Sequence, residues 1–211
     1  IRSVAAGLWS GKDLRLAGWV AAILLATWAG AFIWASAPAI RWDSMSYHLP
    51  VPLAYIRNHG LVEMPESTQT YLAHYAEMLY VLGLFLSNNS ALPGLLHLFS
   101  GLLSTGLAYL IGSRLFGKAV GLLTAMMFGI LPIVTFEAGS AYIDLFLCLY
   151  FGVCLLFLLV WLESDSRAAL LISGLLSGFI IGIKISAFVV IVPLWLFVLL
   201  RLLLRRKWKV P

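Results

Sequence analysis

The sequence predicts an all-α, polytopic helical membrane protein with about six transmembrane helices. Hydrophobic residues make up 62% of its 211 residues, and the mean hydropathy is +0.99. Charged residues make up only 11%, whereas a soluble domain carries about 25%. Because so few polar side chains cannot cover a water-soluble globule, lipid must solvate most of the folded chain.

The same composition excludes other classes of protein. The net charge of +5 does not indicate a nucleic-acid partner, because the cations lie at the ends of apolar segments rather than in one patch. The two cysteines, Cys148 and Cys154, share one apolar run and are too few for a disulfide framework or a metal site. We interpret both as packing residues, and we expect membrane lipids around the chain.

A helix needs about 20 apolar residues to cross the hydrocarbon core, and the chain offers such segments in succession. The last apolar stretch is long enough for two short spans, separated near Lys184. Between the first two spans lies a polar outer loop, residues 39–90, whose apolar segment 77–86 is too short to cross and is interpreted as an interfacial or re-entrant helix. We expect one transmembrane domain, with spans at residues 16–38, 91–115, 119–136, 140–162, 168–183 and 186–204.

The positions of the lysines and arginines predict the orientation of these spans. Six spans put both termini on one side, and most of the fourteen cations fall on that side. The other side keeps only Arg41, Arg57 and Lys184. By the positive-inside rule both termini are cytoplasmic, in a plasma (inner) membrane, and the loop 39–90 is outside. Most acidic residues lie on the opposite side from most of the cations, outside or near the outer face. We therefore expect any chemistry there, near Asp43, Glu63, Glu66, Glu77, Glu137 and Asp144.

The most informative segment for function follows the first span. Asp43 lies a few residues beyond that span, at the depth of the lipid headgroups, where a carboxylate can meet both a lipid phosphate and a water-soluble acceptor. The alternative is that Asp43 caps the next helix, since Asp is a favoured N-cap residue. His48, in the same segment, is either a base or phosphate partner or a merely solvated interfacial histidine.

Other charged residues near the outer face are candidates for substrate binding. Asp144 lies about one turn inside the fourth span, where an acid needs a partner or a cavity, and its alternative role is a structural hydrogen bond. Glu137 comes seven residues earlier, so if the helix extends that far, one helical face would hold both acids together with Cys148, pointing into the bundle. Two cations, Arg57 and Lys184, are candidates for binding an anion, although Lys184 would also suit a side chain that extends to the interface.

His74 and Glu77 form a further candidate pair. Their spacing of three residues lets two side chains on a helix orient one another or bind an acceptor. A surface pair has the same spacing, and that alternative stays open here.

Three motifs, taken in order, resemble a known family. The first is Trp-Asp-x-x-x-Tyr-His-Leu-Pro at 42–50, the second is Ala-His-Tyr-Ala-Glu-Met-Leu-Tyr at 73–80, and the third is a glycine-containing segment at 174–187. Together with the predicted spans they resemble the polytopic C-type (GT-C) glycosyltransferases, which include protein O-mannosyltransferases and lipid A aminoarabinose transferases. The resemblance covers residues 16–204.

The resemblance implies an inverting transfer of a sugar from a polyprenyl-phosphate donor, on the outer face, to a lipid, glycan or protein acceptor. It maps the catalytic acid of the family's first outer loop onto Asp43. Ser44 stands where many members carry a second acid, so no metal site is predicted for the pair, while a divalent cation stays open as a cofactor. The residues expected to bind substrates are His48, Arg57, His74, Glu77, Glu137, Asp144 and Lys184.

The chemistry of such a transfer needs few groups. One carboxylate suffices as the general base, because polyprenyl phosphate is already a stable anion and needs no acid to leave. Cations near the outer face, Arg57 or Lys184, would stabilise the departing phosphate. Full members of the family continue through more spans, so we expect the sequence to be the N-terminal part of a longer enzyme and to be inactive alone.

Two rival interpretations remain. In a transporter or channel, Asp144, Glu137 and Lys184 would line a polar path. A transporter concentrates its acids near mid-membrane, however, whereas most acids of this chain lie in one outer loop. The other rival is a non-catalytic assembly subunit.

The predicted orientation is tested by a reporter that is active only outside the cytoplasmic membrane. Fused after Pro65 the reporter should be active, and fused after Lys209 it should be inactive, because the cation distribution places these two positions on opposite sides. The reverse pattern of activity would contradict the orientation and move every candidate residue to the cytoplasmic face.

Overall fold

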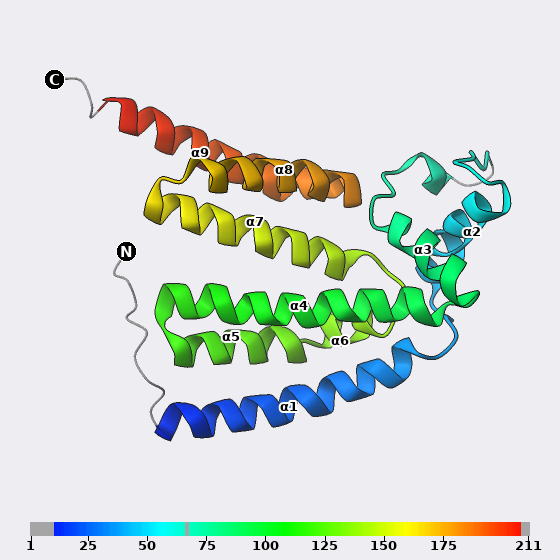
Figure 1. The fold of residues 1–211 in the computed structure, drawn as a ribbon, viewed down its shortest axis with the longest axis horizontal. Helices are drawn as coiled ribbons and strands as arrows, with labels where there is room; N and C mark the ends of the chain where they lie inside the picture. Colours follow the sequence, from blue (N-terminus) through cyan, green and yellow to red (C-terminus); the bar gives the residue numbers. More distant parts are fainter. Residues whose placement is uncertain (1–10, 66–67, 208–211) are drawn as a thin grey trace.

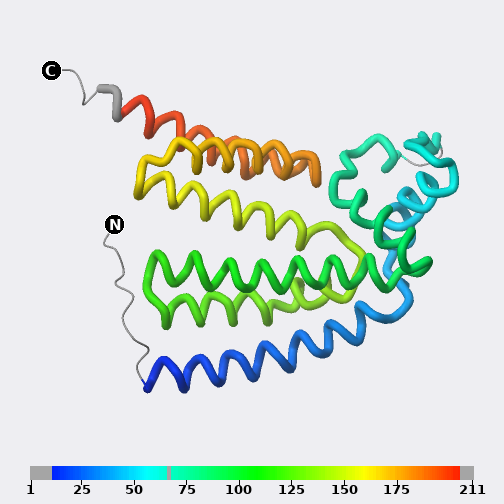
Figure 2. Tube along the Cα trace, viewed as in Figure 1, coloured from blue at the N-terminus to red at the C-terminus, as the bar shows by residue number. Residues whose placement is uncertain are grey.

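The computed structural model describes residues 11–65 and 68–207, and all regular structure within these ranges is helical. Long helices run back and forth between the two ends of a bundle, and an outer loop covers one end (Figures 1 and 2). The bundle consists of α1 (Gly11–Ala35), α4 (Ala91–Phe116), α5 (Lys118–Ile130), α6 (Pro132–Ala138), α7 (Asp144–Ser164), α8 (Arg167–Ile183) and α9 (Phe188–Lys207). The loop contains η1 (Ser44–His48), α2 (Pro50–Arg57), η2 (Thr68–Tyr71) and α3 (Glu77–Ser87).

The lengths and hydropathies of these helices confirm an all-α, multi-pass membrane protein. Four of the described helical segments are long and apolar enough to cross a membrane, namely α1, α4, α7 and residues 185–204. Helices α5 and α6 together qualify as one broken span. Helix α8, with 17 residues, is apolar but shorter, so its crossing of the membrane stays a prediction.

The third expected span, 119–136, is divided into two helices. The axes of α5 and α6 differ by 61°, and the break falls at Leu131, whose ψ of 128° is extended rather than helical. Pro132 explains the break, because its ring excludes the helical conformation for the preceding residue and it has no N–H to donate. After the bend, α6 packs against α1, α4 and the start of α7.

Two other helix boundaries can be compared with the expected spans. Helix α7 begins at Asp144 rather than at residue 140, because residues 139–143 form an irregular loop. The long apolar stretch breaks at Lys184, which is extended (φ −149°, ψ 117°) between α8 and η3 (Ile185–Ala187).

Buried apolar side chains hold the bundle and its outer loop together in three groups. One group joins α7, α8 and α9 and includes Trp161 and Ile180. A second joins α1, α4, α6 and the start of α7 around Trp28 and Leu98. The third, which includes the fully buried Tyr80 of α3, packs the outer loop against the ends of α7 and α8. The outer loop is therefore part of the same packed body as the helix ends.

The crossing of α1 and α4 depends on a glycine. A Cβ at Gly94 would lie 2.7 Å from the carbonyl oxygen of Ala35, whereas a Cβ at Gly106 of the same helix would meet nothing within 4 Å. We therefore expect Gly94→Ala to lower the free energy of unfolding by about 1–3 kcal/mol, the usual cost of overpacking.

The matched control is Gly106→Ala, which should leave stability unchanged or raise it by up to about 1 kcal/mol, since alanine is the better helix former. Thermal unfolding in detergent of the two variants and the unmodified protein checks this difference. Equal melting temperatures for the two variants would contradict the close approach of α1 and α4.

Candidate functional site

Asp43 lies in the turn that joins α1 to η1. Its backbone is already helical (φ −65°, ψ −39°), and its side chain makes no capping hydrogen bond to the helix that follows. The N-cap role that the sequence left open is therefore not the role of this side chain. The carboxylate is half-buried at the end of the bundle covered by the outer loop.

Two further acids come to the same end of the bundle, Glu137 at the end of α6 and Asp144 at the start of α7. Glu137 lies within electrostatic reach of Asp43 and Asp144, and also of the cations Lys184 and Arg41. We call Asp43, Glu137 and Asp144 the acidic cluster. Like charges this close repel one another unless cations or protons compensate, so the cluster depends on its two basic neighbours.

Two tyrosines border the acidic cluster. Burial and the nearby carboxylates of Asp43, Asp144 and Glu77 raise the pKa of Tyr47 to about 12. Burial, followed by the charges of Asp43 and Glu137, also raises the pKa of Tyr142. Both phenols therefore stay protonated at neutral pH and can donate a hydrogen bond to an oxygen in this region. The sequence analysis selected neither tyrosine as a site residue.

Lys184 forms an ion pair with Asp144, with 2.6 Å between Nζ and Oδ1. This contact supplies the partner that the sequence required for Asp144. The two side chains are 42% and 37% exposed, so solvent weakens their attraction and a ligand can reach them. Lys184 thus meets an acid of the cluster instead of only extending to the interface.

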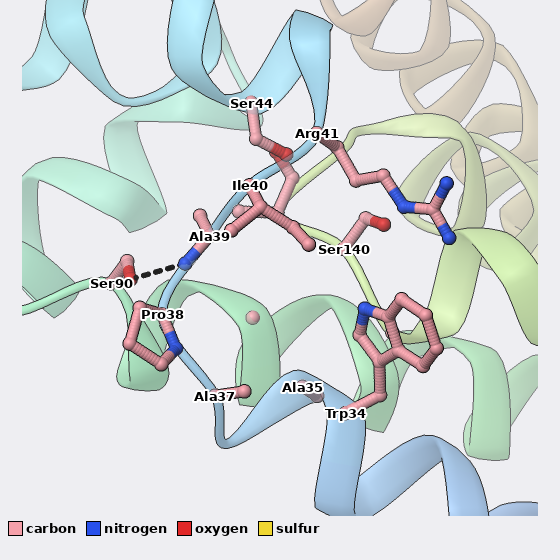
Figure 3. Close-up of a pocket in the computed structure, with 13 residues that line it drawn as sticks. Trp34, Ala35, Ala37, Pro38, Ala39, Ile40, Arg41, Ser44, Ser90 and Ser140 are labelled. Atoms are coloured by element: carbon pink, nitrogen blue, oxygen red, sulfur yellow. Dashed lines mark hydrogen bonds between the residues drawn. The ribbon is translucent and has the colours of Figure 1, made fainter.

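Arg41 is a second cation at this end of the bundle, and the sequence did not select it as a site residue. Its guanidinium lies 3.8 Å from the ring centre of Phe136 and 5.0 Å from that of Trp34, as expected for cation–π contacts. Figure 3 shows Arg41 and Trp34 at a small cavity of about 10 Å³, with Ser140 beside them. That volume has room for about one water molecule.

Arg57 does not join these residues. Its side chain is exposed at the last turn of α2, and it is not among the described groups that shift the pKa of Glu137, Tyr47 or Tyr142. The structure therefore brings together one of the two cations expected from the sequence and replaces the other with Arg41.

His48 and Glu77 are buried against each other, with 3% and 2% of their side chains exposed. The Nδ1 of His48 lies 2.8 Å from Oε1 of Glu77, which ties η1 to α3. His74 precedes α3, and its Nδ1 is 3.7 Å from the same oxygen, too far for a hydrogen bond but close enough for an ion pair. Neither a solvated His48 nor a surface pair of His74 and Glu77 describes these contacts.

The expected alignment of Glu137, Asp144 and Cys148 on one helical face is wrong. Because residues 139–143 interrupt the helix, Glu137 and Asp144 belong to different helices. The loop between α6 and α7 brings the two acids within electrostatic reach of each other. Cys148 is exposed, while Cys154 is buried. The spacing of seven residues predicted a straight helix that the structure does not contain.

Residues 74–211 match the sequence profile of a family described as dolichyl-phosphate-mannose-protein mannosyltransferase. The chain belongs to this family. Membership makes it a glycosyltransferase of the mannosyltransferase type that uses a polyprenyl-phosphate sugar, and it confirms the resemblance to the GT-C enzymes. No curated protein and no solved structure matches the chain. The matched segment contains Glu137, Asp144 and Lys184, whereas Asp43 precedes it.

The mannosyltransferase-family segment also forms an aromatic groove between α3, α7 and α8. The groove has a volume of about 340 Å³ and is lined by Tyr75, Ala76, Met78, Leu79, Phe146, Tyr150 and Phe179. It is open on one side, because Tyr75, Met78 and Leu79 are exposed. Two of its walls belong to α7, which begins at Asp144, and to α8, which ends just before Lys184. The groove therefore lies along the two helices whose ends carry the ion pair.

A close backbone contact joins the two sides of this groove. The N–H of Tyr75 donates to the carbonyl oxygen of Gly182 at 3.2 Å. A Cβ at Gly182 would lie 2.4 Å from the ring of Tyr75, so no other residue fits there unless the ring moves.

The residues of the site do not include an obvious metal centre. Within residues 11–65 and 68–207, no three His, Cys, Asp or Glu side chains are arranged to hold a metal ion. At the position where many family members carry a second acid, Ser44 is buried and its Oγ donates to the carbonyl oxygen of Ala141 at 3.2 Å.

The buried contacts of Glu77 predict how stability depends on pH. Burial acts to raise the pKa of Glu77, but the contacts with His48 and His74 outweigh it and hold that pKa below its ordinary 4.5. Its stabilising effect is thus complete above about pH 4.5 and is lost as the pH falls through the folded-state pKa. Glu77 raises the pKa of His74 above its ordinary 6.5, so that contribution is complete below about pH 6.5 and is lost at higher pH.

We therefore expect Glu77→Gln to destabilise the protein most between about pH 4.5 and 6.5, with a smaller difference from the unmodified protein on either side. Melting temperatures of both proteins across this pH range check the prediction. The control is Glu63→Gln, because Glu63 is an exposed carboxylate of the same loop. A stability difference for Glu77→Gln that is the same at every pH would contradict the ionic contacts.

Proposed function

We propose that the enzyme to which this chain belongs performs an inverting transfer of a sugar from a polyprenyl-phosphate donor to a lipid, glycan or protein acceptor, with Asp43 as the general base. The family supports the donor class. The observation that carries the proposal for Asp43 is its place beside Glu137, Tyr47 and Tyr142 without a capping hydrogen bond. Its carboxylate is not committed to holding a helix end.

The proposed step needs one base and one good leaving group. Asp43 removes the proton of the acceptor while the acceptor atom forms a bond to the anomeric carbon. The bond between that carbon and the phosphate oxygen breaks on the opposite face, and the electron pair leaves with the polyprenyl phosphate. Because the leaving group is a stable anion, no second acid has to protonate it.

Lys184 and Arg41 are the cations that we assign to the phosphate. Lys184 is partly exposed in its pair with Asp144, so a phosphate group can bind it from the open side. The Nε of Arg41 is buried and has no hydrogen-bond partner in the described part of the chain, which leaves a donor for a ligand oxygen. Two fixed cations would stabilise the charge that develops on the departing phosphate. Arg57 has no part in this assignment.

We assign the aromatic groove between α3, α7 and α8 as the binding site for the first isoprene units of the donor. Its lining of Tyr75, Phe146, Tyr150 and Phe179 is mostly apolar, and the groove is open on one side. A prenyl chain in it would have its phosphate near Lys184, which follows α8 directly. The groove therefore fits a lipid that carries a phosphate at one end.

The rival transporter interpretation has less support. The acidic cluster lies at one end of the bundle, with the outer loop over it, and a transport path would need polar groups toward the middle of the membrane. The family points to transfer rather than transport.

The general base is tested by Asp43→Asn in the full-length protein. Membranes containing it are given dolichyl-phosphate mannose with a labelled sugar, and the initial rate of transfer is measured at saturating donor. Asparagine keeps the size of the side chain but cannot accept the proton, so we expect the rate to fall by about 10²–10⁴-fold. Asp43→Glu keeps the charge and should retain part of the activity.

Glu63→Gln is the matched control, since it removes an exposed carboxylate of the same loop and should transfer at the unmodified rate. If Asp43→Asn transfers within about threefold of the unmodified enzyme, Asp43 is not the base, because a general base contributes more than that.

A further inference from the structure

His97 is a histidine of α4 that neither the sequence motifs nor the proposed step uses. Its side chain is completely buried, yet both ring nitrogens are engaged. Nδ1 lies 2.8 Å from the carbonyl oxygen of Ser140 and 3.0 Å from that of Glu137. Nε2 lies 3.0 Å from the backbone nitrogen of Leu145.

These partners determine the proton arrangement of the ring. The two carbonyl oxygens can only accept, so Nδ1 carries the hydrogen, and the Leu145 N–H can only donate, so Nε2 is unprotonated. His97 is therefore held as a neutral imidazole with a single tautomer. It exchanges no proton in this arrangement, and its burial keeps it from touching a substrate.

The contacts of His97 enclose the loop between α6 and α7. Glu137 lies in the last turn of α6, and Leu145 follows Asp144 in the first turn of α7, where backbone groups have no partner within their own helix. The carbonyl oxygen of Glu137 also accepts from the N–H of Ser140 at 2.9 Å, so His97 adds a further donor there, and its Nε2 accepts from the Leu145 N–H. One side chain thus bonds to the end of one helix and to the start of the next. The two acids of the cluster, Glu137 and Asp144, stand at the two ends of the segment that His97 holds.

Two other elements hold the middle of the same loop. The hydroxyl of Ser44 in η1 donates to the carbonyl oxygen of Ala141 at 3.2 Å. The hydroxyl of Tyr80 in α3 donates to the backbone carbonyl oxygen of Tyr142. Ser44 directly follows Asp43. The loop that His97 fixes is therefore also the surface against which the turn with Asp43 rests.

We propose that His97 is a positioning residue for sugar transfer, which sets the placement of Glu137 and Asp144 relative to each other and to Asp43. This inference rests on the proposed function, because it takes the acidic cluster to be part of the site of sugar transfer. A shift of about 1 Å at a reacting centre can lower a rate by about 10²-fold. Loss of the His97 contacts should therefore lower the rate of transfer by about 10–100-fold without removing any group that touches substrate.

The test compares three variants in the full-length enzyme, assayed with labelled dolichyl-phosphate mannose. His97→Leu removes both contacts. His97→Asn keeps an amide donor near the position of Nδ1, and His97→Gln keeps an amide oxygen near that of Nε2. The control is Thr105→Val, because Thr105 is a buried polar residue of the same helix whose hydroxyl donates to the carbonyl oxygen of Gly101 within α4.

We expect the transfer rate per folded molecule to fall by about 10–100-fold in His97→Leu, to be partly restored in His97→Asn or His97→Gln, and to stay within about threefold of the unmodified enzyme in Thr105→Val. The pH dependence of the rate should keep its shape in all variants, because His97 transfers no proton. If His97→Leu does not accumulate as folded protein, the Asn and Gln variants decide the question by the same rate comparison.

Two results would overturn the proposal. One is a rate per folded molecule in every His97 variant that equals that of Thr105→Val, which would make His97 purely structural. The other is the loss of one limb of the pH profile, which would make it a proton-transfer group. Failure of the base assignment is detected separately, by an active Asp43→Asn, and leaves the comparison among the His97 variants valid.

Discussion

The structure depends on how the backbone between α6 and α7 satisfies its hydrogen bonds. Two helices end or begin there inside an apolar bundle, where an unpaired N–H or carbonyl is costly. Side chains from three separate elements, His97, Ser44 and Tyr80, supply the missing partners. The same contacts attach the outer loop to the bundle, so the polar requirement of one short loop decides where the functional side chains stand.

The acidic cluster concentrates negative charge at one end of the bundle, where Asp43 is half-buried and Asp144 is partly exposed. Asp43, Glu137 and Asp144 would repel one another, and Lys184 and Arg41 compensate them. Such a mixture of fixed charges suits a reaction in which a proton goes to a carboxylate while an anion leaves toward a cation. The charges are held by packed helices and rings, so little reorganisation is needed when a substrate arrives.

The helices could be predicted from the sequence, but the details of the site could not. Length and hydropathy were sufficient for the long apolar helices and for the break near Lys184. The role of His97 depends on carbonyls about forty residues away, and a single histidine in an apolar helix gives no pattern that points to them. The cation–π contacts of Arg41 likewise need Phe136, which only the bend at Leu131 brings into place. The alignment of Glu137, Asp144 and Cys148 required a helix continuous through residues 139–143, and the irregular loop there removes it.

The contact of Tyr75 with Gly182 has a consequence for the kind of lipid that the groove accepts. The backbone of the outer loop is bonded to the end of α8, and the ring of Tyr75 packs against Gly182, so these contacts limit how far the two walls can separate. If the prenyl chain of the proposed donor occupies this groove, only the portion nearest its phosphate would touch protein. Such a donor would be recognised by the saturation and branching of its first units, and the length of its tail would be left to the membrane.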